Sequence, residues 1–457
     1  MRRIELKGGR RLARADLNAS GTLPAEVVAS AEAIVDDVRA RGDAAVRELS
    51  RRFDGFCPDA LRVPDELVAE APGLVDPAFL AALERARDQI RDFHEREREQ
   101  SWFTTRADGT MLGVQVTPVA SAAVYVPGGR AQYPSTVLMD TVPAKVAGVE
   151  RVVMLTPPQP DGTLSSHTLA AAALAGVDEV YAVGGAQAIA AAAYGTESIP
   201  AVEKIVGPGN AFVAAAKRYV SGDVGIDMVA GPSEVCVLAD ATADPIVVAA
   251  DLMAQAEHDP MASCYLVTCD AALPARVEAA VEELVSQSPR EEITRASLDD
   301  RGVIVVAEGL ASAVDAVNVI APEHLELHCE DALALLGRIR NAGAIFVGPW
   351  SSEPLGDYVA GPNHTLPTGG TARWASPLGV YDFQKRSSVI CYTPEGLLAD
   401  APAAQTLAQA EGLWAHALSV GLRRRIAEGG SFDPADVHRV AWPVMIQGDS
   451  PFVSLED

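Results

Sequence analysis

Aromatic residues, cysteines and long apolar runs are all scarce in this sequence of 457 residues. Phe, Trp and Tyr make up only 5% of the chain, while Ala, Val and Gly dominate, which suits helices packed closely on sheets. No stretch approaches the roughly 18 consecutive apolar residues of a membrane-spanning helix, and no apolar signal-peptide segment follows the basic start. We therefore expect a cytoplasmic protein that does not enter a membrane.

The cysteines exclude a disulfide framework. Only six are present, and none is part of a C-x-x-C motif: Cys57, Cys236, Cys264, Cys269, Cys329 and Cys391. In a large chain without a secretory signal, this pattern is typical of reduced and mostly buried thiols.

Basic residues are outnumbered by acidic ones. The chain has 37 Lys and Arg against 62 Asp and Glu, a formal net charge of −25. Such a charge repels a phosphate backbone, and the only basic clusters, in residues 2–14 and 423–425, are short. We expect no binding to nucleic acid.

The remaining composition is that of a globular protein, with 49% hydrophobic and 22% charged residues. A prior of about 150 residues per domain indicates roughly three domains. Residues 24 to about 100 predict helices, one opening at Pro24 and another running from Phe79 to Glu99. Mixed charges over residues 85–98 are typical of a solvated helix face.

From about residue 112, short apolar runs alternate with segments of helical length. The predicted strands are 122–126, 152–155 and 179–183 and, after Gly231, 235–238, 264–267, 302–306 and 344–347. Helices are expected near 245–258, 275–287 and 310–317. Strands alternating with helices predict doubly wound parallel sheets, so the expected fold class is α/β with two consecutive units.

Four segments follow from this pattern: a mostly helical part (1–110), a first α/β unit (111–233), a second α/β unit (234–380) and a helical C-terminal part (381–457). Residues 360–386 are dense in Gly, Pro, Thr and Ser, which predicts a long ordered loop of the kind that is usually functional. Helix returns from about 402 to 427. This last part is too short to bury its apolar face alone, so we expect it to pack on the body or on a second subunit.

Gln255 and His258 lie three residues apart and therefore on one face of a helix. Pro260 disfavours helix at the residue before it, which puts the pair in the final turn. By spacing alone this is a weak metal site, and a helix-end histidine without a ligand remains the alternative.

Glu323 and His324 follow Pro322, a residue that suits the first turn of a helix. The positive end of that helix would favour the carboxylate and disfavour the imidazolium, so a neutral His beside an ionised Glu could act as a pair of proton acceptors. The alternative is charge decoration at the start of an ordinary helix.

Two further pairs could supply ligands. Asp357 and His364 are plausible, but their separation across a loop fits no simple zinc spacing. Glu411 and His416 point about 140° apart on a regular helix. They would therefore approach one site from different sides, unless Gly412 distorts the helix.

No complete G-x-G-x-x-G fingerprint is present. The nearest sequence, Gly207-Pro-Gly-Asn210, lacks the third glycine and fails as a Rossmann motif. It remains a tight turn at which backbone can approach a ligand closely. Tyr125-Val-Pro-Gly-Gly129 and Gly184-Gly-Ala-Gln187 are similar turns at the ends of predicted strands, where ligands of α/β sheets bind.

In their residues and in their order along the chain, these motifs resemble those of the histidinol dehydrogenase family over nearly the whole chain. They are Tyr125-Val-Pro-Gly-Gly-Arg-Ala, Gly184-Gly-Ala-Gln-Ala, Lys204-Ile-Val-Gly-Pro-Gly-Asn-Ala, Ala230-Gly-Pro-Ser-Glu234, Ala254-Gln-Ala-Glu-His258, Ala321-Pro-Glu-His-Leu325, Gly356-Asp-Tyr358, Gly361-Pro-Asn-His-Thr-Leu-Pro-Thr-Gly-Gly370 and Glu411-Gly-Leu-Trp-Ala-His416.

The resemblance implies an enzyme of histidine biosynthesis that oxidises L-histidinol to L-histidine through bound L-histidinaldehyde, with two NAD+ and one zinc ion per subunit. It implies two incomplete Rossmann-like units, similar to those of aldehyde dehydrogenases, and a homodimer in which the C-terminal segment completes the partner's site. The positions carried over are Gln255, His258, Asp357 and His416 for zinc, Glu323 and His324 for acid–base chemistry, Ser233, His364 and Glu411 for substrate, and Tyr125, Gln187 and Asn210 for NAD. The zinc ligands and His324 would also contact the substrate.

Three other interpretations are open. A paralogue could use the same residues on a different alcohol, because a motif set does not fix specificity. A zinc hydrolase could use Glu323 to activate water, although no H-E-x-x-H motif is present. A non-catalytic binding protein would leave the gathering of His and carboxylates in Gly- and Pro-rich segments unexplained.

Overall fold

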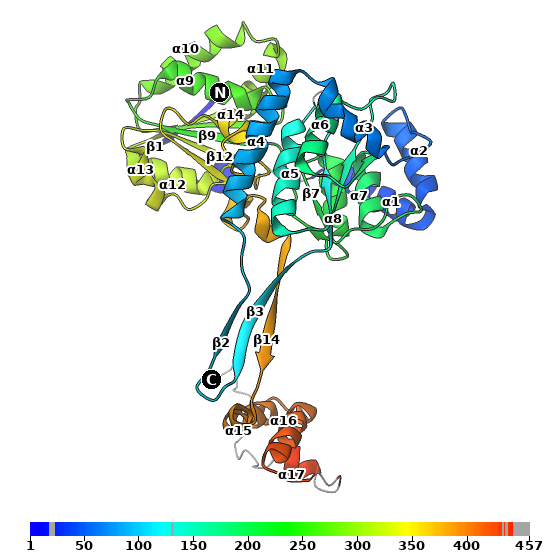
Figure 1. The fold of residues 1–457 in the computed structure, drawn as a ribbon. Helices are drawn as coiled ribbons and strands as arrows, with labels where there is room; N and C mark the ends of the chain where they lie inside the picture. The colour runs from blue at the N-terminus through cyan, green and yellow to red at the C-terminus, as the bar shows by residue number, and fades with distance from the viewer. Residues whose placement is uncertain (18–22, 129–131, 432–433, 435–436, 442–457) are drawn as a thin grey trace. The chain divides into compact units, whose positions relative to one another are not determined.

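The computed structural model describes residues 1–17, 23–128, 132–431, 434 and 437–441. The chain forms two compact units, neither continuous in sequence: Met1–Arg98 with Pro118–Gln384, and Glu99–Thr117 with Lys385–Asp457. The predicted boundary after residue 110 therefore falls inside the second unit. Figure 1 shows the elements of both units.

The first unit contains two parallel sheets, which confirms the α/β class. The first sheet consists of β4 (Ser121–Tyr125), β5 (Arg151–Thr156), β6 (Glu179–Ala182), β7 (Lys204–Val206) and β8 (Gly225–Ile226). Its order is β6-β5-β4-β7-β8, and every neighbouring pair is parallel. The winding direction reverses between β4 and β7, and the carboxyl ends of strands at such a switch point flank a crevice.

Helices cover both faces of this sheet (Figure 1). One face is covered by α1 (Ala25–Arg41), α2 (Asp43–Phe53), α7 (Gly185–Tyr194) and α8 (Ala211–Val220); the other by α3 (Asp65–Glu70), α4 (Pro77–Glu95), α5 (Pro134–Ala147) and α6 (Ser166–Ala175). The helices predicted between residues 24 and 100 are confirmed, and they are part of this α/β layer because α1, α2 and α4 bury their apolar faces on it.

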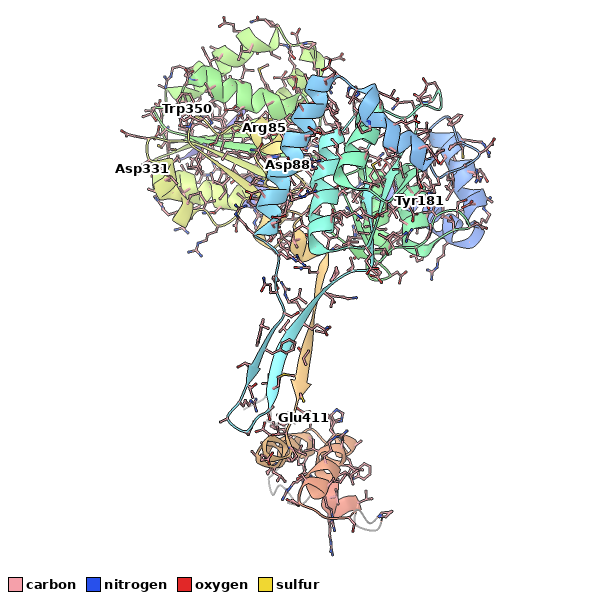
Figure 2. All side chains as sticks on the ribbon, viewed as in Figure 1. Arg85, Asp88, Tyr181, Asp331, Trp350 and Glu411 are labelled. Atoms are coloured by element: carbon pink, nitrogen blue, oxygen red, sulfur yellow. The ribbon has the colours of Figure 1, made fainter. Side chains whose placement is uncertain are left out.

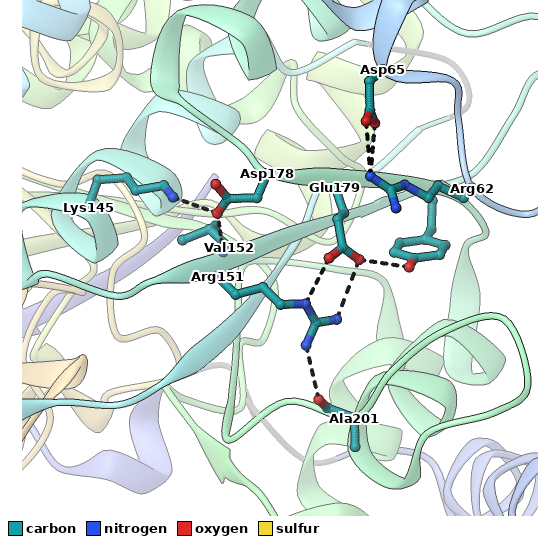
Figure 3. A network of polar contacts seen from close by, with 9 residues as sticks. Arg62, Asp65, Lys145, Arg151, Val152, Asp178, Glu179 and Ala201 are labelled. Atoms are coloured by element: carbon teal, nitrogen blue, oxygen red, sulfur yellow. Dashed lines mark hydrogen bonds and ion pairs between the residues drawn. The ribbon is translucent and has the colours of Figure 1, made fainter.

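The amino edge of the first sheet is closed by ion pairs (Figure 3). Arg151, the first residue of β5, donates from Nε to Oε1 of Glu179, the first residue of β6, over 2.9 Å. Asp178 accepts from the Lys145 ammonium at 2.5 Å and from the backbone N–H of Val152 at 2.6 Å. The opposite, carboxyl edge holds the glycine turns.

The second sheet has six parallel strands in the order β1-β11-β10-β9-β12-β13. They are β1 (Arg2–Leu6), β9 (Glu234–Ala239), β10 (Ser263–Thr268), β11 (Val303–Ala307), β12 (His324–His328) and β13 (Ala344–Val347). Strand β1 was not predicted from the sequence. It adds the basic N-terminus to this sheet as an edge strand. Ile4 and Leu6 of β1 are buried while its two arginines are exposed.

The helix predicted at Pro322 is wrong. Ala321 adopts a left-handed conformation (φ 52°) and ends α12 (Leu310–Ile320), after which the chain enters β12. All five residues of β12 are buried, because the strand lies between β9 and β13 and is covered on both faces. Leu325 and Leu327 join one apolar core, so His324, Glu326 and His328 point to the other face.

That other face carries the helices that build the site. It is covered by α9 (Pro245–Ala256), α10 (Leu273–Val285) and α11 (Glu291–Arg301), while α12 and α13 (Ala332–Leu335) cover the first face. A short helix, α14 (Glu353–Tyr358), packs near α9. Gly356 allows α14 to approach the sheet closely, since a Cβ atom there would lie 2.6 Å from the ring of Phe346.

The loop predicted at residues 360–386 is confirmed up to Phe383. It contains only short 3-10 turns, and it is held on α5 by polar side chains. The amide of Asn363 donates to the carbonyl of Met139 at 2.6 Å, and the hydroxyl of Thr365 donates to Oδ1 of Asp140 at 2.8 Å. The loop therefore connects the two sheets of the first unit.

The second unit has a three-stranded sheet and a small group of helices. The sheet order is β14 (Gln384–Cys391), β3 (Met111–Pro118), β2 (Trp102–Thr105), and the helices are α15 (Pro394–Ala410), α16 (Trp414–Ala427) and α17 (Val437–Ala441). Its buried hydrophobic cluster consists of Ala408, Ala417 and Ala441, with Trp414 and Leu418 packed against it. Across the described parts of both units, every helix is too short or too polar to span a bilayer.

Candidate active site with metal-binding side chains

Glu323 and His324 lie at the amino edge of the second sheet, where β12 begins beside β9. The carboxylate Oε2 of Glu323 accepts from the backbone N–H of Glu234 at 2.8 Å, which fixes it against the start of β9. His324 is the first residue of β12 and is only 4% exposed. The two predicted residues therefore lie at the start of a strand and not at the start of a helix.

Three elements surround the His324 ring. Nδ1 lies 3.2 Å from the carbonyl oxygen of Glu234 and 3.2 Å from Oε1 of Gln255, near the end of α9. Nε2 lies 3.6 Å from Oδ1 of Asp357 on α14. Glu353, one turn before Asp357 on α14, places Oε1 3.8 Å from Nδ1. A carboxylate oxygen thus lies near each of the two ring nitrogens of His324.

The charges around His324 differ from the sequence expectation. Burial alone would lower the pKa of His324, but the carboxylates of Glu353, Glu323 and Asp357 outweigh burial and raise it well above the ordinary value. The neutral His expected from a helix N-terminus is therefore wrong for the chain by itself, because no helix begins there. Burial likewise tends to raise the pKa of Asp357, yet the neighbouring His324 lowers it overall.

Glu323 has the pKa of a base that works near neutrality. Burial raises the pKa of its carboxyl to about 7, against the opposing effects of His324 and of hydrogen bonds from Glu234 and Ser233. A carboxylate with such a pKa accepts a proton more readily than an exposed one. Ser233, predicted to bind substrate, thus lies beside Glu323.

A set of potential metal ligands lies next to this pair. One ligand atom each from His258, Glu353 and Asp357 lies within 4.8 Å of the others. Gln255 lies in the last turn of α9, as predicted, and contacts His324, whereas His258 lies in the turn after the helix, which ends at Ala256. Imidazole nitrogen with carboxylate and amide oxygen is a donor set that suits zinc, so the residues present fit the metal implied by the sequence.

Glu353 was missed by sequence analysis. It is 1% exposed, and burial raises the pKa of its carboxyl to about 8, with the nearby carboxylates of Asp357, Glu326 and Glu323 adding to the shift and His324 opposing it. The available signal was its position four residues before Asp357, which puts both carboxylates on one face of α14.

The predicted residues at 364, 411 and 416 fall in different units. His364 belongs to the first unit: its Nδ1 lies 2.9 Å from the carbonyl oxygen of Asp357, and its Nε2 lies 3.3 Å from the hydroxyl of Thr136. Glu411, labelled in Figure 2, follows α15, and His416 lies on α16, both exposed in the second unit. They do not share a regular helix, because Glu411 and Gly412 end α15 before α16 begins.

A cavity of about 540 Å³ opens beside these groups. Its lining includes His324, Asp357 and His364 together with Phe346, Asn363 and Leu366. A volume of this size is typical of sites for small molecules. His324 and Asp357 therefore line one cavity that can hold a small molecule, and Glu323 lies beside His324, outside the lining.

The three residues predicted for the nucleotide follow strands of the first sheet, at its carboxyl edge. The hydroxyl of Tyr125 accepts from the backbone N–H of Gly185 at 3.0 Å, and Gln187 donates to Asp54 at 3.3 Å. Asn210 caps α8 by accepting from the N–H groups of Phe212 and Val213 at 3.0 and 3.1 Å. These contacts order the turns around the switch point between β4 and β7. Residues 129–131 of the first turn lie outside the described residues.

The fold and the site together define a class of protein: an α/β protein in which a buried Glu–His pair lies beside a cavity and beside side chains that could hold a metal ion. A family model described as histidinol dehydrogenase matches residues 18–424. The chain belongs to the histidinol dehydrogenase family, whose name denotes an oxidoreductase.

Individual relatives agree with this assignment. The chain is 53% identical over 392 residues to the histidinol dehydrogenase of Bacillus subtilis (strain 168), covering 86% of this chain and 92% of that protein. It is 52% identical over 404 residues to that of Pseudomonas putida, covering 87% and 91%. The crystal structure of histidinol dehydrogenase from Elizabethkingia anophelis matches with a TM-score of 0.88 and 33% identity, over 94% of this chain and 99% of that one.

Proposed function

We propose that this protein oxidises L-histidinol to L-histidine through bound L-histidinaldehyde, with two NAD+ as successive hydride acceptors and one zinc ion per subunit. The observation that carries the proposal is that His324 and Asp357 line one cavity while the Glu323 carboxylate lies 3.8 Å from Nδ1 of His324. The overall reaction takes a primary alcohol and water to a carboxylate, so it needs one group to accept the hydroxyl proton and one to activate water.

His324 is suited to the alcohol step. Its ring is held by Glu234 and Gln255 at Nδ1, while the neighbour of Nε2 among the described residues is Oδ1 of Asp357 at 3.6 Å, and both side chains line the cavity. In the neutral form, Nε2 accepts the proton of the substrate hydroxyl as the carbon is oxidised. NAD+, when bound, supplies the acceptor for the hydride.

Glu323 is suited to the aldehyde step. Its backbone-anchored carboxylate takes a proton from water as the water oxygen bonds to the aldehyde carbon, which gives a hydrate with a second removable hydride. Because Glu323 and Asp357 are both near His324, the two steps can occur without release of the aldehyde, and this protects it from side reactions.

Gln255, His258 and Asp357 would hold zinc, with Glu353 close enough to join them or to orient them. Zinc, when bound, would hold the imidazole and amine of the substrate, and its charge would offset the carboxylates that raise the pKa of His324. The side chain of His364, buried against Asp357 and Thr136, would contact the substrate from the loop side.

The fourth zinc ligand, His416, and the substrate contact Glu411 would come from the partner in a homodimer. Two observations support this. Both residues are exposed on the second unit, and the described part of that unit buries few apolar residues while exposing Trp102, Phe103, Ile390, Leu407 and Ile426 by more than half of their surface. Exposed apolar surface of this extent on a small unit is typical of an interface between subunits.

The direct test is NADH formation from L-histidinol and NAD+ by purified protein of known metal content. We expect two NADH per histidinol, loss of this activity when a chelator removes zinc, and recovery when zinc is returned. A folded, zinc-loaded protein that forms no NADH would contradict the substrate assignment and direct the same assay to other amino alcohols. Hydrolysis without NAD+ would favour a hydrolase instead.

The Glu323 carboxyl is expected to titrate with a midpoint near pH 7 in the zinc-free protein, because burial raises its pKa to about 7. Its charged form is the base, so the fraction able to activate water falls as the pH drops through that midpoint. Adding zinc should move the midpoint down, because a nearby cation favours the carboxylate. Infrared difference spectra, with Glu323→Gln to assign the carboxyl band, would measure both midpoints. A Glu323 midpoint near pH 4 without zinc would contradict the burial argument.

A further inference from the structure

A second polar cluster lies under the proposed zinc site on the same face of the second sheet. Oδ2 of Asp251 on α9 lies 3.2 Å from Nε2 of His328 on β12, and Oε2 of Glu326 on β12 lies 3.5 Å from the same nitrogen. All three side chains are at least nine-tenths buried. Neither the proposed mechanism nor the family motifs use these residues.

On β12, α9 and α14, the cluster lies beside the site, within a turn or a few strand residues of a site residue. On β12, Glu326 and His328 follow His324 at the two-residue period of one strand face. On α9, Asp251 precedes Gln255 by one turn. On α14, the backbone N–H of Glu353, one turn before Asp357, donates to Oε1 of Glu326 at 2.7 Å. The three elements α9, β12 and α14, which carry Gln255, His324 and Asp357, thus each contact or contribute to the cluster directly.

The charges of Asp251, Glu326 and His328 explain why these contacts favour one position of the elements relative to each other. Burial would lower the pKa of His328, but Asp251 and Glu326 outweigh burial and raise it to about 9, so the imidazolium lies between two carboxylates at neutral pH. Removing one partner leaves an uncompensated buried charge, which costs more than an exposed pair would. A shift of α9 along β12 would separate Asp251 from His328, and a shift of α14 would break the hydrogen bond from the N–H of Glu353 to Glu326.

We propose that Asp251, Glu326 and His328 are positioning residues that fix α9 and α14 against β12 and thereby set the metal affinity of the site above them. The inference rests on the proposed function only in assigning the metal site to Gln255, His258 and Asp357. Glu326 is the pivotal member, because one of its oxygens pairs with His328 and the other holds the start of α14.

The test compares Glu326→Leu, which removes both ties, with Glu326→Gln, which keeps an acceptor for the N–H of Glu353. Ile304→Ala is the matched control, because Ile304 is fully buried in the same sheet on β11 and lies in the apolar core rather than beside the cluster. For each full-length variant, the zinc dissociation constant is measured by competition with a chromogenic chelator, the visible spectrum is recorded after loading with Co²⁺, and the melting temperature is determined.

We expect Glu326→Leu to weaken zinc binding about 10- to 100-fold and to change the Co²⁺ spectrum, as loss of outer-shell support does elsewhere. Glu326→Gln should retain most of the affinity. Ile304→Ala should lower the melting temperature with unchanged zinc affinity. If Glu326→Leu does not fold, His328→Gln replaces it in the comparison, with the same expected loss.

Three results would overturn the proposal. Glu326→Leu could behave as Ile304→Ala does, losing stability but not affinity. The wild-type chain could bind two metal ions and the variant one, which would make the cluster itself a metal site. The wild-type chain could bind no divalent metal. Metal binding is measured without substrate. A failure of the protein to oxidise histidinol can therefore be distinguished from a failure of this proposal.

Discussion

Replacing Glu323 with Gln is expected to separate the two oxidations. The amide cannot accept a proton from water, while its shape and its contact with the N–H of Glu234 are retained. Oxidation of L-histidinaldehyde should therefore slow about 10²- to 10⁴-fold, the usual worth of a general base. Oxidation of L-histidinol should be affected less, because His324 accepts the proton in that step.

The measurement is single-turnover NADH formation, started once with L-histidinol and once with L-histidinaldehyde. The matched variant is His324→Gln, for which the slow step should be the alcohol oxidation. Equal losses on both substrates in Glu323→Gln would contradict the division of labour between the two residues. Zinc content must be equal in the proteins compared, so that the loss is assigned to the base.

Mixing two variants that each fail to form L-histidine is expected to restore histidine formation if His416 acts across the dimer. Activity here means formation of L-histidine, because Glu323→Gln subunits can still oxidise the alcohol. In a heterodimer of His416→Ala and Glu323→Gln subunits, one site combines the intact Glu323 of the first subunit with the intact His416 of the second, and the other site carries both defects. Random reassociation of equal amounts should recover about a quarter of the wild-type activity, because half of the dimers have one working site.

The experiment requires each variant to be purified alone, dissociated and reassociated together, with each variant treated alone as the control. If His416 served its own subunit, every site in the mixture would carry one defect and no activity would return. Size-exclusion chromatography would show whether dimers had reformed, so that a failure to associate is recognised as such. Full activity from a monomer would contradict the exchange of C-terminal segments.

Much of the fold was predictable because local patterns agree with it. The strands at 122–126, 152–155 and 235–238 are short apolar runs bounded by Gly, Pro or Asp residues, and such runs are typical of buried parallel strands. The loop after Ala360 was recognisable by its Gly and Pro content. The end of a helix near Gln255 followed from Pro260.

The failures have physical causes. Strand β12 alternates Leu with His and Glu, and its polar residues are buried only because α9 and α14 cover them, which is a tertiary effect absent from local sequence. β1 was missed because its partner, β11, is about 300 residues away. Glu353 was missed because its part in the site depends on α14 lying beside α9, whereas Gln255 and His258 could be found from spacing within one helix.

The site lies at the amino edge of the second sheet, and this has a consequence for how the enzyme can change. At the opposite edge, the turn after β13 lines the cavity of about 540 Å³ with Trp350, Ser351 and Ser352, whereas turns such as residues 269–272 after β10 do not line it. In most open α/β sheets those turns carry the ligand contacts and resist alteration. Here the turns that do not line the cavity make no such contact, so insertions accepted there during evolution, or introduced to attach a label, can accumulate without disturbing catalysis.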